Sequence, residues 1–150
     1  FSGLAAPHWD QYARGTMVGI TGGTTREQIV RATLESIAYQ VSDNLKVMRS
    51  DSGIPIERIR VDGGMVCTRF LMQFQSDILG IPVEVPAVFD TTAVGAARLA
   101  ALGHGDFPDP YGVAGGQMKK CYEPHMSEDQ RQYLLSQWER AVQRAMHWAR

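Results

Sequence analysis

Ile59-Arg60-Val61-Asp62-Gly63-Gly64, followed by residues 65–80, is the stretch that decides the fold. Apolar and charged residues alternate before the glycines, which predicts a strand, and Leu71, Phe74 and Ile78 predict one apolar side of a following helix. Glycine has no Cβ, so the backbone of such a turn can approach a phosphate or a ribose beside a helix start that offers N–H groups. The stretch predicts one wall of a nucleotide site.

A second unit of the same kind follows. Residues 82–85 predict a strand, and Thr91 or Thr92 caps a predicted helix that runs to Leu102. Successive strand-turn-helix units are typical of α/β proteins. Small residues such as Gly95 and Ala96 permit close approach to a neighbouring backbone or to a ligand, and they favour close helix packing.

The region before residue 59 predicts a strand at 16–21 and then a long helix. Thr24 and Glu27 have the spacing of a capping box, and the helix stops at Ser52-Gly53-Ile54-Pro55. Its apolar residues recur at helical spacing, so we expect that face to cover the sheet. In the first loop, two roles of Arg14 stay open: an ion pair with Asp10, or a contact with another subunit or domain.

The region after residue 102 predicts a loop, a strand and a helix. Residues 103–116 are rich in glycine and proline, residues 117–123 predict a strand, and Ser127 caps the last helix. A chain of 150 residues is the size of one domain. Because it opens without Met on what reads as the middle of a loop, we expect it to be part of a longer polypeptide.

Composition excludes several classes of function. The 15 basic and 16 acidic residues are nearly balanced and form no block of like charge, so no nucleic acid partner is expected. Cys67 and Cys121 have no His or Cys at ligand spacing, which favours a reducing, cytoplasmic compartment and argues against zinc. The most apolar stretch is too short to cross a bilayer, so no membrane partner is expected. No metal-ligating residue is predicted.

The two common nucleotide motifs do not fit the glycine pair. A dinucleotide-binding fold needs G-x-G-x-x-G and an acid about 20 residues later; Glu84 has the right separation, but the glycine spacing is wrong. A Walker A loop needs a lysine after its glycines, and none follows here. Asp62 has two readings of equal weight: a ligand of magnesium or ribose, or a helix cap or turn former.

Six runs of sequence resemble the glycerol kinases of the FGGY carbohydrate kinase family. They are GLAAPHWD (3–10), YARG (12–15), RATLESIAYQ (31–40), VDGG (61–64), FLMQFQSDILG (70–80) and TTAVGAA (91–97). The resemblance implies an actin-like ATPase fold with ribonuclease-H-like domains, of which residues 1–150 form the distal, nucleotide-facing part of the C-terminal domain. It also implies ATP or ADP with Mg²⁺ as the cofactor and transfer of phosphate to glycerol.

The resemblance assigns three nucleotide-binding residues. Gly64 matches the second glycine of the family's adenosine motif, Gly63 makes the same turn possible, and Thr68 stands where glycerol kinases usually have an asparagine that contacts adenine. Residues 65–69 are the least family-like stretch, and there Arg69 replaces another residue that is often asparagine. We therefore expect weaker or altered adenine recognition.

The catalytic residues implied by the resemblance lie outside this chain. The family's catalytic aspartate precedes the segment, and glycerol binds through an N-terminal domain that the chain does not include. The isolated chain is therefore expected to be inactive, and the whole protein to be a homo-oligomer, either dimer or tetramer. Three alternatives stay open: a kinase for a pentulose or another polyol, a noncatalytic assembly or regulatory module, and a dinucleotide oxidoreductase.

Overall fold

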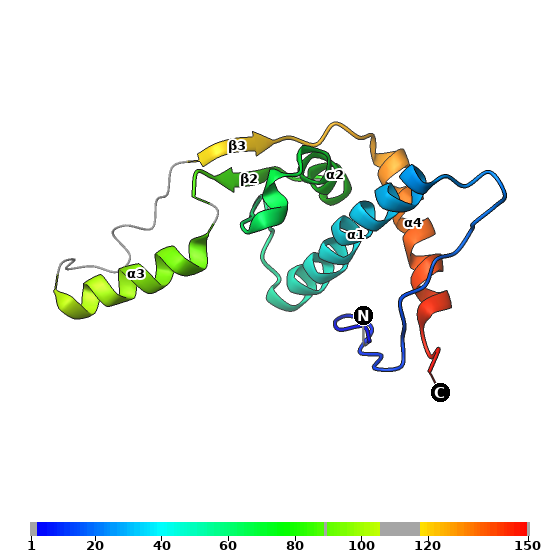
Figure 1. The fold of residues 1–150 in the computed structure, drawn as a ribbon, viewed down its shortest axis with the longest axis horizontal. Helices are drawn as coiled ribbons and strands as arrows, with labels where there is room; N and C mark the ends of the chain where they lie inside the picture. The colour runs from blue at the N-terminus through cyan, green and yellow to red at the C-terminus, as the bar shows by residue number, and fades with distance from the viewer. Residues whose placement is uncertain (1–2, 89, 106–117, 150) are drawn as a thin grey trace.

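The computed structural model describes residues 3–88, 90–105 and 118–149 (Figure 1). Its elements are α1 (Arg26–Ser52), β1 (Ile59–Arg60), η1 (Gly64–Cys67), α2 (Arg69–Leu79), β2 (Val83–Pro86), α3 (Thr91–His104), β3 (Met118–Tyr122) and α4 (Glu128–Ala145). The strands form one sheet in the order β1-β2-β3. β1 and β2 are parallel, whereas β3 is antiparallel to β2, with Val83 opposite both Ile59 and Tyr122. This mixture of helix and sheet confirms the predicted α/β class.

The core lies around α2, and its buried residues come from α1, α2, the sheet and the short turn before α2. Leu71 and Ile78 on α2 are each 1% exposed, and Val83 on β2 is fully buried. The predicted apolar side of this helix, with Phe74 between the other two, is therefore confirmed. A connection from β1 through α2 to the parallel strand β2 is the unit that the sequence predicted.

The long helix α1 packs on α2 and not on the sheet. The ring of Tyr39 on α1 meets Phe74 edge to face at 5.5 Å and stacks on Trp138 of α4 at 5.2 Å. Burial between these rings raises the pKa of Tyr39 to about 12. The prediction that α1 covers the sheet was wrong, because α2 already occupies that face.

Helix α1 begins one residue later than the predicted cap. Thr25 and Gln28 form the capping box: the Thr25 N–H donates to Gln28 Oε1 at 2.9 Å, and the Gln28 N–H donates to Thr25 Oγ1 at 3.4 Å. Thr24 instead accepts from the Thr21 N–H at 2.9 Å, which closes the preceding turn. The helix ends as predicted at Gly53, whose φ is +64°.

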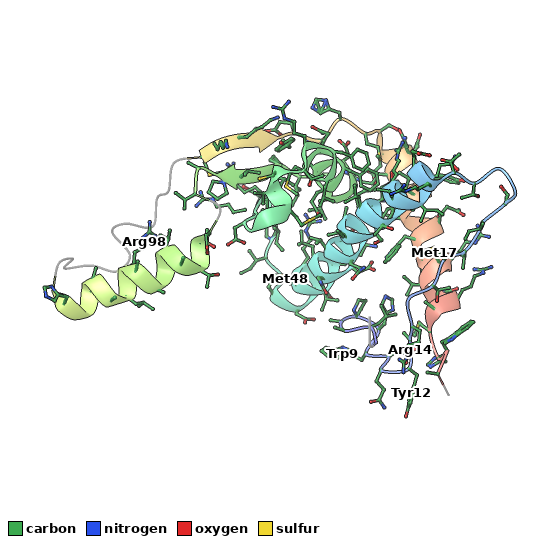
Figure 2. The ribbon with its side chains drawn as sticks, in the orientation of Figure 1. Trp9, Tyr12, Arg14, Met17, Met48 and Arg98 are labelled. Carbon is green, nitrogen blue, oxygen red and sulfur yellow. The ribbon has the colours of Figure 1, made fainter. Side chains whose placement is uncertain are left out.

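The first 25 residues contain no strand within the part that the structure describes, so the strand predicted at 16–21 is wrong. The predicted ion pair of Asp10 with Arg14 is also wrong. Asp10 is buried and accepts from the N–H groups of Tyr12 (2.8 Å) and His147 (2.6 Å), while Arg14 donates to the carbonyls of Gln11 and Ala13. The His147 N–H is the main cause that lowers the pKa of Asp10. Figure 2 labels Tyr12 and Arg14 at this junction of the two chain ends.

The elements after α2 are tied back to that helix by buried or half-buried polar groups. The Ser76 hydroxyl lies 3.0 Å from the carbonyl of Ile81 and 2.9 Å from that of Tyr122. Asp77 Oδ1 accepts from the N–H of His125 at 2.7 Å, just before α4. These bonds fix the start of β2 and the end of β3, which lie side by side, on α2.

The last predicted elements agree with the structure where it describes them. β3 lies inside the predicted range 117–123, and Ser127 caps α4 by accepting from the Gln130 N–H at 3.3 Å. α3 continues to His104, two residues beyond the predicted end, and most of the loop predicted at 103–116 lies outside the described residues. Within the described ranges, no helix combines the length and apolar character needed to span a bilayer.

Candidate nucleotide site

The turn after β1 requires a glycine at one position. The Val61 N–H donates to the Glu84 carbonyl at 3.0 Å, so the strand pairing extends to Val61. Gly63 then takes φ +87° and ψ 179°. Only glycine adopts this region without large strain. Gly64 has no such backbone requirement, since its φ lies outside the left-handed region.

The helix predicted at 65–80 is interrupted. η1 covers Gly64–Cys67, Thr68 is extended with φ −83° and ψ 94°, and α2 starts only at Arg69. Val66, at the centre of η1, is 5% exposed and belongs to the core. The buried side chain of Val66 thus anchors the short turn η1 to the core. A continuous helix was the wrong prediction, because helical spacing alone does not show such a break.

The backbone at the glycine pair is open. A Cβ placed on Gly63 or on Gly64 meets no other atom within 4 Å, and both residues are exposed. Thr68 is half-buried at the other end of η1 and makes no capping hydrogen bond with its side chain. The three residues predicted to bind a nucleotide therefore lie on one short turn. Its main chain is accessible, as contact with a ligand requires.

Asp62 is held by the start of α3. Its Oδ2 accepts a hydrogen bond from the hydroxyl of Thr91, 29 residues along the chain. The cap of α3 is Asp90, which accepts from the Ala93 N–H at 3.0 Å, so the prediction of Thr91 or Thr92 as the cap was wrong. Within the described residues, no group of three or more His, Cys, Asp or Glu side chains is placed to hold a metal ion.

Glu84 is already paired with two arginines. Its carboxylate accepts from Arg60 Nε at 3.0 Å and from Arg58 at 2.7 Å. These bonds, with that of Arg60 contributing most, lower the pKa of Glu84. The carboxylate is therefore engaged at the sheet and is not available to bind a ribose, which removes the main support for a dinucleotide site.

The close packing predicted for α3 is not found among the described residues. A Cβ on Gly95 meets nothing within 4 Å, and none of the described α3 residues is buried. Figure 1 shows this helix set apart from α1, α2 and α4. The small residues of α3 are therefore exposed or half-buried and not part of a close-packed contact.

One groove among the described residues lies away from the glycine turn. A groove of about 510 Å³ runs between α1, α2 and the segment leading into α4, and Arg31, Phe70 and Asp77 are among its lining residues. The lining of this groove includes none of Gly63, Gly64 and Thr68. The candidate nucleotide site is thus separate from this groove, and the space at its two glycines is open.

Residues 1–104 match the model of the C-terminal domain of the FGGY family of carbohydrate kinases. The chain belongs to this family. Glycerol kinase 2 of Thermotoga maritima is 55% identical to this FGGY chain over 149 residues, which are 99% of the chain and 30% of that relative. The chain therefore spans less than a third of the length of the curated relatives that it matches.

Solved structures of FGGY kinases share the fold. Plasmodium falciparum glycerol kinase, crystallised with ADP, is 36% identical with a TM-score of 0.83, over 97% of this chain and 29% of its own. A xylulose kinase from Brucella ovis is 29% identical with a TM-score of 0.73, over 96% of this chain and 28% of its own. The domain is thus similar in structure to glycerol and xylulose kinases, which confirms the expected actin-like ATPase fold.

Sequence reasoning missed two residues of this region. The hydrogen bond between Thr91 and Asp62 joins segments distant in sequence, and no local pattern marks it. The cap at Asp90 could have been predicted from the sequence, because aspartate is as good a cap as threonine and Asp90 directly precedes Thr91. The roles of Gly63, Gly64 and Thr68 toward a nucleotide stay predictions.

Proposed function

We propose that the full-length protein catalyses the ATP-dependent phosphorylation of glycerol to glycerol 3-phosphate, and that this chain supplies part of its adenine-nucleotide site. The observation that supports it is the exposed, unobstructed main chain at Gly63 and Gly64, in a chain 55% identical to a glycerol kinase. The related Plasmodium falciparum glycerol kinase was crystallised with ADP, which indicates the class of ligand.

In this proposal, residues 1–150 are the distal part of the C-terminal domain and hold the nucleoside against the turn. Mg²⁺ accompanies the nucleotide, and an N-terminal domain outside this chain binds glycerol and supplies the base. Phosphoryl transfer depends on positioning and on charge stabilisation, so one half of a site does no chemistry. We therefore infer that the isolated chain is inactive. A cytoplasmic location and assembly as a dimer or tetramer stay predictions.

The test is a kinase assay on the full-length protein. We expect release of ADP from Mg-ATP that depends on glycerol and is at least tenfold faster than with xylulose at equal concentration. The isolated chain of 150 residues, assayed in parallel, should release none. A preference for xylulose would assign the alternative substrate class, of which the similar Brucella ovis enzyme is an example. Absence of ADP binding in a calorimetric titration with Mg²⁺ would instead indicate a noncatalytic module.

Replacing Thr68 by asparagine should tighten ADP binding. An asparagine amide offers a donor and an acceptor to a base edge, whereas the threonine hydroxyl offers one rotatable O–H. One regained hydrogen bond contributes about 1 kcal/mol, or roughly a fivefold lower dissociation constant. Asparagine is also a good residue at the start of α2, where Thr68 stands, so folding should be preserved.

Calorimetry with ADP and Mg²⁺ on the full-length protein measures this effect. The matched control is Thr68→Ser, which keeps a hydroxyl at the same place and should bind ADP as the parent does. Equal affinities for Thr68→Asn and the parent would show that the residue at position 68 does not contact the base.

A further inference from the structure

We propose that Thr91 is a positioning residue for the nucleotide site, and that it acts through Asp62. Its hydroxyl holds the Asp62 carboxylate and thereby the backbone of the adjoining Gly63-Gly64 turn. Affinity for the nucleotide then depends on a side chain that does not touch the nucleotide. This inference rests on the proposed function, since it concerns the same turn.

The turn needs such support because Gly63 lies in a sparsely populated backbone region. At φ +87° and ψ 179° its conformation persists only where the surroundings fix it. Upstream, the Val61 N–H is bound to the Glu84 carbonyl at 3.0 Å. Downstream, the Val66 N–H donates to the Gly63 carbonyl at 3.3 Å. Asp62 is the one residue between the upstream anchor and Gly63, and Thr91 fixes its side chain.

The hydrogen bond of Thr91 is not a by-product of helix capping or of core packing. Asp90 caps α3 with its side chain, and its carbonyl accepts from the Val94 N–H at 3.2 Å, so the Thr91 hydroxyl is not needed at the helix start. None of the described α3 residues is buried, and Thr91 itself is exposed. The bond from Thr91 therefore ties an otherwise outlying helix to the glycine turn.

The bond also controls a negative charge. Asp62 adjoins the two glycines on which we place an anionic ligand, and a carboxylate turned toward phosphates would repel them. As an acceptor for the Thr91 hydroxyl, the carboxylate is directed to the α3 side of the turn. Losing the hydroxyl would remove both the support of the backbone and this restraint on the charge.

The experiment compares Thr91→Val, Thr91→Ser and the matched control Thr92→Val in the full-length protein. Valine keeps the branched shape but cannot donate, whereas serine keeps the donor. We expect Thr91→Val to weaken ADP binding about fivefold, the size of one lost hydrogen bond, and to raise KM for ATP with kcat and KM for glycerol unchanged. Thr91→Ser and Thr92→Val should both match the parent.

A double-mutant cycle with Asp62→Ala provides the second readout. If the two residues act as one unit, Asp62→Ala combined with Thr91→Val should bind ADP no worse than Asp62→Ala alone. Additive losses, or a Thr91→Val variant with the parent's ADP affinity, would overturn the inference while the proposed function stands. A parent protein that binds ADP but does not phosphorylate glycerol would contradict only the proposed function. A parent without ADP affinity would overturn both.

Discussion

Replacing Leu71 by alanine is expected to destabilise this domain by about 2–5 kcal/mol, since removing a buried leucine costs both the lost transfer energy and the cavity left behind. Leu71, on α2, is 1% exposed and belongs to the core cluster. The nearby contacts leave little freedom to close the cavity, because Ser76 and Asp77 bind α2 to the segments around β3 and α4. The loss should therefore lie in the upper half of that range.

Hydrogen exchange of the α2 amides in the full-length protein is the suitable measurement, because it reports the opening of this domain and not of its neighbours. Protection should fall by at least about 300-fold, which corresponds to about 3.5 kcal/mol, the middle of that range, at 1.4 kcal/mol per tenfold. Leu99→Ala is the matched control: Leu99 is 68% exposed on α3, so the α2 amides should keep their protection. Equal exchange in the two variants would mean that Leu71 does not support the core.

The central unit of the fold, β1-α2-β2, could be predicted because the sequence patterns that indicate it are local. The helical spacing of Leu71, Phe74 and Ile78 predicted the buried side of α2. Gly53 and Gly80 marked the ends of α1 and α2, where their φ angles are +64° and +65°. Each of these signals is confined to a few neighbouring residues. Such local patterns can be recognised in a single sequence.

The errors arose where neighbouring residues compete for one role. Thr24 and Thr25 are both good caps, and the choice between them depends on which turn closes before the helix. Asp90 and Thr91 compete in the same way at α3. Asp90 forms the cap, and the hydroxyl of Thr91 donates to Asp62 instead. Propensity ranks these residue types as nearly equal, so sequence alone cannot separate them.

Other errors concern pairing between distant segments. Residues 16–21 contain threonine, valine and isoleucine, which are common in strands, but no partner strand reaches them among the described residues. Asp10 lies four residues before Arg14, yet its carboxylate binds the backbone at His147, which a local pattern cannot show. The glycine turn of the site was predictable, whereas the residues that hold it in place were not.

Placing a valine at Gly64 should abolish nucleotide binding and leave the fold intact. A Cβ at this position meets nothing in the protein within 4 Å, and the backbone of Gly64 does not require glycine. The only space that the new side chain would occupy is the space in which we place the nucleotide. We expect ADP affinity to fall by at least about 100-fold, equivalent to about 3 kcal/mol, with melting of the full-length protein within about 2 °C of the parent.

Two other glycines make this result interpretable. Gly22→Val is the matched control, because its Cβ also meets nothing within 4 Å and it lies before α1, in a different part of the chain, so ADP affinity should not change. Gly63→Ala differs in kind: its φ of +87° penalises any side chain, so stability and affinity should fall together. Loss of affinity with full stability at Gly64 alone would show that the glycine is there for a ligand. Unchanged ADP binding in Gly64→Val would mean that the nucleotide lies elsewhere.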